Sequence, residues 1–227
     1  MQLKLVLFVI VIVSASVQAQ EARPRESSDD QPQSVSNDDR GRAFIIASET
    51  QPLPTPASHG RIISEPQQNS IFLGKGWQAP SLRASEPELA NLLASIRDQS
   101  QLTALDQLGM KNFFAATASQ EKIDLESDRT ISDLQIQSML EGMLKSGALQ
   151  RPDAGTIYVV YLDPGMRSTL GTMIAGKHYV AYHSLFNAAG LKIRYAVVAF
   201  AANQKAAYQI ALRAFLAAAL NPNGAGS

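Results

Sequence analysis

The stretch "TIYVVYLDPG", residues 156–165, decides the fold. The part "TIYVVYL" carries almost no polar side chain, which is typical of a strand at the centre of a sheet with both faces covered. The following Asp-Pro-Gly predicts a turn. Because ligands commonly bind in loops after such strands, the polar residues of this loop are weak candidates for a binding site: Asp163, Arg167, Ser168 and Thr169. An ordinary turn is the favoured interpretation of the same residues.

Helical and strand patterns surround this stretch. Residues 130–147 form the clearest helical pattern, with Ser132 as the expected N-cap and Gly147 as the expected C-terminal stop. The order of two helices, three strands and a last helix predicts a single α/β or α+β domain with a small central sheet flanked by helices. A further helix is expected to begin at Ser85, which fits a capping box with Glu88, and others are expected at 101–109 and 204–220. Strands are expected within 70–77 and at 178–184 and 192–200. A loop is expected at 163–177.

The chain divides into three expected parts. Residues 1–19 have the pattern of a secretory signal peptide, with cleavage expected after Ala19. The apolar run is too short to span a bilayer comfortably, and an uncleaved anchor is the alternative. Residues 20–60 are rich in Ser, Asp, Gln and Pro, interrupted only by "AFII", and are expected to be a disordered linker. The folded domain is then 61–227, in a periplasmic or secreted protein.

The composition excludes several kinds of chemistry. Lys and Arg number 20, as do Asp and Glu, so the formal net charge is zero and nothing favours a nucleic-acid partner. The chain has no cysteine, which excludes disulfides, thiolate metal sites and a cysteine nucleophile. No cofactor is expected, and no stable membrane insertion is expected after signal cleavage.

Histidine and tryptophan supply the remaining candidate residues. The odd spacing of His178 and His183 would put them on opposite faces of a strand, so they should not share a metal. His183, next to Ser184, is a weak catalytic candidate, although a hydrogen-bonded structural histidine is favoured. The motif "GKGW", residues 74–77, lacks the spacing of a phosphate loop. Its Trp77 is a weak ligand-binding candidate, with a core aromatic as the favoured alternative.

Several segments together resemble bacterial secreted relatives of the EXORDIUM, or phosphate-induced protein, family. The resemblance spans residues 62–224 and is most specific between "IYVVYLDPG" and "YAVV". The segments that carry it are, in order, "IFLGKGW", "DLQIQSMLEGMLKSGAL", "IYVVYLDPG", "YHS" and "IRYAVV".

The resemblance implies a functional helix that this chain has altered. Fuller relatives have a pattern like S-H-E-L-A-E-A-x-T-[DN]-P, followed by Gly-Trp and an acidic segment, which looks like a zinc-peptidase helix. Here "LRAFLAAALNPNG" places Arg213 at the His, Ala214 at the Glu and Ala217 at the second acid. Arginine stays protonated and has no lone pair for zinc, and alanine can neither ligate nor move a proton. We therefore expect no metal site and a domain that is C-terminally incomplete.

The favoured interpretation is a secreted or periplasmic EXORDIUM-like protein without catalytic activity. Its expected partner is an unknown extracytoplasmic ligand, such as a cell-envelope polymer. One alternative is a hydrolase of peptidase type that uses unidentified residues, with His183 and Asp163 as weak candidates. The other alternative is a cell-envelope or polysaccharide-binding module that uses Trp77.

Overall fold

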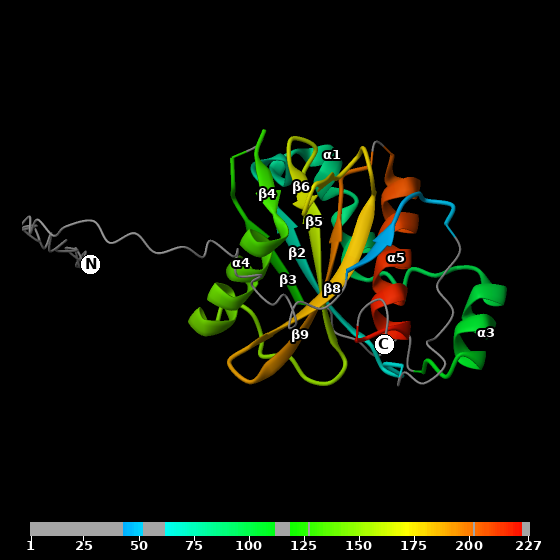
Figure 1. The fold of residues 1–227 in the computed structure, drawn as a ribbon. Coiled ribbons are helices and arrows are strands. Elements are labelled where there is room, and N and C mark those ends of the chain that lie inside the picture. Colours follow the sequence, from blue (N-terminus) through cyan, green and yellow to red (C-terminus); the bar gives the residue numbers. More distant parts are fainter. Residues whose placement is uncertain (1–42, 52–61, 112–118, 127, 202, 224–227) are drawn as a thin grey trace, which may run out of the picture. The chain divides into compact units, whose positions relative to one another are not determined.

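A six-stranded sheet lies at the centre of the compact unit Asn37–Ser227 (Figure 1). The computed structural model describes residues 43–51, 62–111, 119–126, 128–201 and 203–223. The strand order is β1-β8-β9-β5-β2-β3, in which β9, β5, β2 and β3 run parallel and β8 runs antiparallel to both of its neighbours. The strands are β1 (Phe44–Ile46), β2 (Gln67–Leu73), β3 (Ser119–Ile123), β5 (Thr156–Leu162), β8 (Ala181–Ala188) and β9 (Leu191–Val198).

A small sheet and several helices complete the unit. The small sheet has the order β4-β6-β7, from β4 (Thr130–Ser132), β6 (Arg167–Leu170) and β7 (Met173–Ile174). The helices are the 3-10 helix η1 (Lys75–Gln78) and α1 (Pro80–Arg83), α2 (Glu86–Ala90), α3 (Gln99–Gln107), α4 (Asp133–Ser146) and α5 (Gln204–Leu220). This mixed α/β architecture, with helices flanking a central sheet, confirms the predicted fold class.

Strand β5 is buried on both faces, as its sequence predicts. Its odd-numbered residues from Ile157 to Tyr161 belong to a hydrophobic core shared with α5. Its even-numbered residues from Tyr158 to Leu162 belong to a second core shared with α4 and the small sheet. The two cores lie on opposite faces of the sheet because successive strand side chains alternate in direction.

Helix α5 is buried on nearly every side. It contacts β8, β9 and β5 on the sheet and α2 away from it. The hydroxyl of Tyr208 donates to the carbonyl oxygen of Leu92 at 3.1 Å, and the N–H of Ile63 donates to the carbonyl oxygen of Ala219 at 2.8 Å. The alanine-rich sequence of α5 thus suits a helix packed between the sheet and other segments, where small side chains allow close approach.

Helix α4 begins and ends where the sequence predicts. The Ser132 hydroxyl accepts from the Gln135 N–H, and the Gln135 side chain accepts from the Ser132 N–H, which completes a capping box. At the other end Gly147 adopts a left-handed conformation with φ 76°.

A polar cluster fixes the start of α4 to the sheet. The Asp133 carboxylate accepts hydrogen bonds from the hydroxyls of Tyr182 at 2.7 Å and Tyr195 at 2.6 Å. The Gln137 side chain donates to the same carboxylate at 2.7 Å. Burial, together with the nearby Asp133 charge, raises the pKa of both tyrosines, so their hydroxyls remain donors.

Several local expectations differ from the structure. The helix expected from Ser85 ends at Ala90, and the strand expected at 178–184 begins at Ala181. The expected linker contains a strand, β1, because its "AFII" pairs with the edge of β8. The expected loop at 163–177 contains β6 and β7. The expected capping box at Ser85 is absent, because the Ser85 hydroxyl donates to the Leu82 carbonyl oxygen at 2.7 Å instead.

The predicted signal peptide, residues 1–19, and the linker up to residue 42 lie outside the described residues. Within the part of the chain that the structure describes, no helix is both long and apolar enough to cross a membrane.

We predict that Tyr195→Phe destabilises the protein more than Tyr158→Phe. Tyr195 donates to a carboxylate, whereas Tyr158 donates to the neutral Gln150 carbonyl oxygen at 2.7 Å. Loss of a hydrogen bond to a charged group costs about 1.5–3 kcal/mol, against about 0.5–1.5 kcal/mol for a neutral one. Urea denaturation of both variants would measure the difference, and equal losses would contradict a special role for Asp133.

Candidate functional site

Asp163 holds together the turns that follow β2 and β5. Its side chain is fully buried, and its carboxylate accepts from the Gly76 N–H at 2.7 Å and from the Gly165 N–H at 2.9 Å. Its own N–H donates to the carbonyl oxygen of Leu73 at 3.0 Å. The acidic residue of the loop expected to bind a ligand therefore accepts hydrogen bonds from backbone N–H groups of the protein itself.

The glycines of "GKGW" are required by this carboxylate. Gly74 has φ 112° and ψ 150°, a conformation essentially restricted to glycine. A Cβ at Gly74 would lie 2.3 Å from the Asp163 carboxylate, and one at Gly76 would lie 2.8 Å from it. The motif is thus an internal carboxylate cradle rather than a phosphate loop.

Trp77 follows the cradle and packs in an aromatic cluster. It is 4% exposed, and its indole N–H donates to the carbonyl oxygen of Tyr161 at 3.2 Å. Its ring meets that of Phe72 edge-on with centroids 4.7 Å apart, and Phe72 stacks on Tyr161 at 4.9 Å. Trp77 is therefore a core aromatic, as the favoured interpretation had it, but it also lines a cleft.

This cleft lies at the carboxyl ends of β5 and β9 and has a volume of about 280 Å³. Its walls come from the end of β5, the end of β9, helix α1 and the first turn of α5. Its lining includes Trp77, Ser81, Leu82, Phe200, Asn203 and Gln204. We call it the carboxyl-edge cleft.

The topology of the sheet explains where the carboxyl-edge cleft lies. β5 and β9 are parallel neighbours. After β5 the chain continues into β6, whose Leu170 packs in the core shared with α4. After β9 it continues into α5, which packs in the opposite core. Adjacent parallel strands whose connections go to opposite faces leave a crevice at their carboxyl ends, where ligands of open α/β sheets bind.

The lining of the cleft is aromatic, apolar and uncharged. Among its residues the one titratable side chain is that of Tyr161, and burial raises its pKa well above the ordinary value. Its hydroxyl is occupied in donating to the Leu89 carbonyl oxygen at 2.7 Å. The hydroxyl of Ser85 donates to Leu82, with no base beside it among the lining residues. The cleft offers aromatic surface, hydroxyls and amides.

Other hollows are less suited to a ligand. One of about 580 Å³ lies near the amino ends of the strands, but its Arg194 donates to the carbonyl oxygens of Pro222 and Ala154 and its Asp153 is bonded within a local turn. A second, of about 370 Å³, lies beside the β8–β9 hairpin, and a third, of about 330 Å³, lies beside α5. All three are larger than the carboxyl-edge cleft, but none of them lies at the carboxyl ends of the parallel strands, where the ligand sites of α/β sheets lie.

His183 is a buried histidine on β8. It is 2% exposed, and Phe44 of β1 stacks on it with ring centroids 5.3 Å apart. Its Nε2 atom has no hydrogen-bond partner. Burial lowers the pKa of His183 to about 4, so the ring is neutral at pH 7. The expected hydrogen-bonded histidine is instead one with an unsatisfied ring nitrogen, which costs about 1–3 kcal/mol.

The structure does not bring Asp163 and His183 together. His183 pairs with Ala196, which pairs with Val159 of β5. The strand spacing and rise then separate His183 from Asp163 by about 10 Å across the sheet and about 13 Å along it. The two side chains cannot share a hydrogen bond, so the weak catalytic pairing has no geometric basis.

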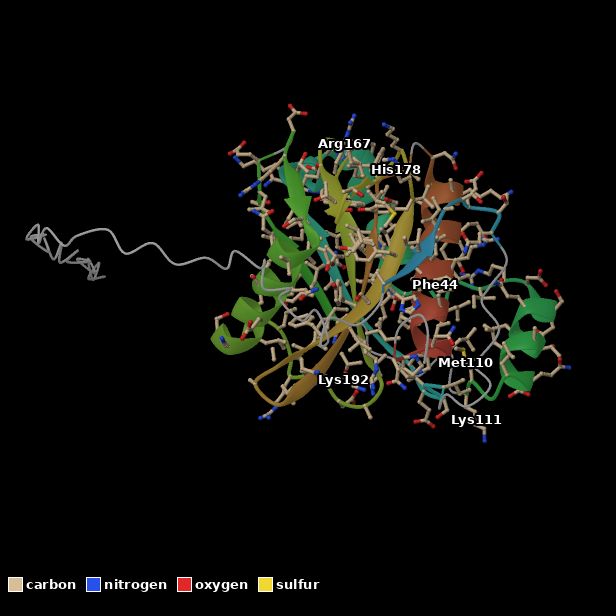
Figure 2. The ribbon with its side chains drawn as sticks, viewed as in Figure 1. Phe44, Met110, Lys111, Arg167, His178 and Lys192 are labelled. Atoms are coloured by element: carbon tan, nitrogen blue, oxygen red, sulfur yellow. The ribbon has the colours of Figure 1, made fainter. Side chains whose placement is uncertain are left out.

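The other sequence candidates are also dispersed. Arg167 is exposed at one end of the unit (Figure 2). Ser168 is fully buried, with its hydroxyl 3.0 Å from that of Tyr179. His178 is exposed in a turn, where its Nδ1 accepts from the Ile174 N–H at 2.9 Å. None of these three lines the carboxyl-edge cleft.

The residues of the altered helix pattern lie in α5. Ala214 and Ala217 are fully buried. The Arg213 guanidinium donates to the carbonyl oxygen of Gln51 at 2.8 Å and to the Gln209 side chain at 3.1 Å. In the part of the chain that the structure describes, no three His, Asp or Glu side chains gather as a metal site would need.

Sequence reasoning found Trp77 but missed most of the cleft lining. Phe200, the first residue after the "YAVVA" run, is 37% exposed, and Asn203 caps α5 by accepting from the Ala206 N–H at 2.7 Å. An aromatic residue between a buried strand and a helix N-cap could have identified Phe200 and Asn203 as candidate lining residues from the sequence. Comparison of the chain with family models, curated proteins and solved structures finds no match.

We predict opposite effects for two glycine substitutions. Gly74→Ala should destabilise the protein by about 2 kcal/mol or more, because it combines backbone strain with a clash against the Asp163 carboxylate. Gly142→Ala is the matched control, since its Cβ meets nothing within 4 Å inside α4. It should stabilise the protein by up to about 1 kcal/mol. Thermal or urea unfolding would measure both, and a neutral Gly74→Ala would contradict the cradle.

We predict that His183 makes the protein lose stability as pH falls from about 6.5 to about 4. In this range the unfolded chain binds a proton at His183 that the folded protein, with a pKa of about 4, does not. The loss reaches about 3 kcal/mol and is fully recovered above pH 6.5. His183→Phe should flatten this part of the stability curve, whereas equal slopes in both proteins would contradict the prediction.

Proposed function

We propose that this chain is a secreted or periplasmic EXORDIUM-like binding protein without hydrolase activity, and that it binds a neutral ligand in the carboxyl-edge cleft. The observation that carries the proposal is the lining of the cleft, whose described residues are aromatic, apolar or uncharged and polar; the nearby Glu88 carboxylate lies outside this lining and accepts from the Gln204 side chain at 2.8 Å. Such a lining can hold a ligand yet has no group to act as a general acid or base.

The ligand class follows from the same lining. Trp77 and Phe200 offer apolar ring surface, and Ser81 offers a hydroxyl. The amide oxygen of Gln204 and the amide nitrogen of Asn203 can also contact a ligand, because the hydrogen bonds of these side chains, to Glu88 and from Ala206, use the other atom of each amide. A sugar ring has one apolar face and a rim of hydroxyls, which matches this pattern. The volume of about 280 Å³ lies just below the usual range of about 300–1,000 Å³ for ligand sites, so we propose that only one sugar unit of a cell-envelope glycan enters the cleft.

The single tryptophan of the chain makes this proposal directly testable. Titration with N-acetylglucosamine oligosaccharides and with soluble peptidoglycan fragments should change Trp77 fluorescence saturably. Phe200→Ala should weaken binding by about tenfold, because loss of the exposed ring removes about 1.4 kcal/mol of contact.

Leu134→Ala provides the matched control. Leu134 is 49% exposed and lies on α4, so it is a second large exposed hydrophobic side chain outside the cleft. Its removal should leave the affinity unchanged. An absence of any fluorescence response to both kinds of fragment, or an equal loss of affinity in the two variants, would contradict the proposed function.

A further inference from the structure

Several polar side-chain atoms around the carboxyl-edge cleft already have partners within the protein. The indole N–H of Trp77 donates to the Tyr161 carbonyl oxygen, and the Ser85 hydroxyl donates to a backbone carbonyl oxygen of α1. The Tyr161 hydroxyl donates to one carbonyl oxygen and accepts from the Gln68 amide at 3.1 Å. The polar atoms that remain for a ligand belong to Ser81 of α1 and to the start of α5, which lie at the same end of the unit (Figure 1).

Gln204, in the first turn of α5, has its side-chain amide held in one orientation. Its amide nitrogen donates to a carboxylate oxygen of Glu88 in α2 at 2.8 Å. A carboxylate offers only acceptors, so the nitrogen rather than the oxygen of the amide must face Glu88. No described residue donates a hydrogen bond to the amide oxygen of Gln204. The lining of the cleft therefore includes a hydrogen-bond acceptor at this position.

Asn203, the N-cap of α5, presents the complementary group. Its side-chain oxygen accepts from the Ala206 N–H at 2.7 Å. A backbone N–H can only donate, so the amide oxygen must face Ala206 and the amide nitrogen of Asn203 is left over. Within the described part of the chain this nitrogen has no acceptor. One donor and one acceptor thus stand on consecutive residues of the lining, and a different partner fixes the orientation of each.

A secondary amide matches this pair of groups better than a hydroxyl does. The N–H of such an amide can donate to the Gln204 oxygen, while its carbonyl oxygen accepts from the Asn203 nitrogen. A hydroxyl carries both functions on one oxygen atom, whereas the amide presents them on two atoms, as the two side chains do. The methyl group of an acetamido substituent would in addition cover apolar lining, which includes Leu82 and the ring of Phe200.

We propose that the carboxyl-edge cleft selects sugars that carry an acetamido group, and that Glu88 is the positioning residue for this selectivity. The inference rests on the proposed function, because it names the substituent that the ligand of the same cleft carries. Glu88 does not itself line the cleft, and it acts through the amide nitrogen of Gln204. Without its carboxylate the amide of Gln204 could turn and present a donor to the ligand N–H, which is also a donor.

The test compares two disaccharides that differ only in this substituent. Diacetylchitobiose carries acetamido groups where cellobiose carries hydroxyl groups. Titrations followed by the fluorescence of Trp77, the single tryptophan of the chain, should show about tenfold tighter binding of diacetylchitobiose, because two hydrogen bonds and a methyl contact distinguish the sugars. Equal affinities would overturn this inference and leave the proposed function standing. No response to either sugar or to peptidoglycan fragments would overturn both.

Glu88→Ala tests the positioning role. It should weaken the binding of diacetylchitobiose by about fivefold or more and leave the affinity for cellobiose nearly unchanged, whereas a merely structural role would change both affinities alike. Glu141→Ala is the matched control, because Glu141 is a half-buried carboxylate that pairs with Lys145 within α4 and lies outside the lining of the cleft. It should keep the wild-type preference. A Glu88→Ala protein that also keeps this preference would overturn the role of Glu88.

Discussion

The buried carboxylate of Asp163 is the constraint on which the carboxyl edge of the sheet depends. A carboxylate without solvent must be met by hydrogen-bond donors, and here backbone N–H groups of two different turns meet it. One of those turns comes from "GKGW" and the other from "DPG". Two motifs that look independent in the sequence are therefore joined by the hydrogen bonds of one carboxylate. Trp77 follows the first turn directly, and its position under the carboxyl-edge cleft is therefore set by Asp163.

The place of the cleft follows from topology, whereas its chemistry follows from a few side chains. β5 must be covered on both faces because its residues are apolar in both directions. Coverage of the two faces sends the connections after β5 and β9 to opposite faces, which opens the crevice between them. The rim of the cleft carries Phe200 and uncharged polar residues, and these are the groups that the proposed neutral ligand would contact.

Sequence patterns predicted the structural features that depend on residues close together in the chain. The caps of α4 and the burial of β5 are encoded by neighbouring residues, and both were predictable. The link between Gly76 and Asp163 was not, because it joins residues far apart in the chain. Ser85 shows the same limit: its sequence resembles the true cap at Ser132, but the preceding turn leaves the Leu82 carbonyl oxygen within reach of its hydroxyl. β1 escaped prediction because its stability comes from β8 and α5 rather than from its polar neighbours.

Helix α5, where the EXORDIUM resemblance would place a metal-site helix, also borders the edge strand β1 of the sheet. Ala214 and Ala217 are fully buried, and an acidic side chain at either place would need a metal or a cationic partner to offset its desolvation. Alanine avoids that requirement. Where the EXORDIUM resemblance would place a histidine, Arg213 instead binds the backbone of the segment that follows β1. A guanidinium has only hydrogen-bond donors. It can therefore bind a peptide carbonyl oxygen, but it has no lone pair with which to bind zinc. The same helix position that the resemblance associates with metal chemistry here holds an extended segment beside β8.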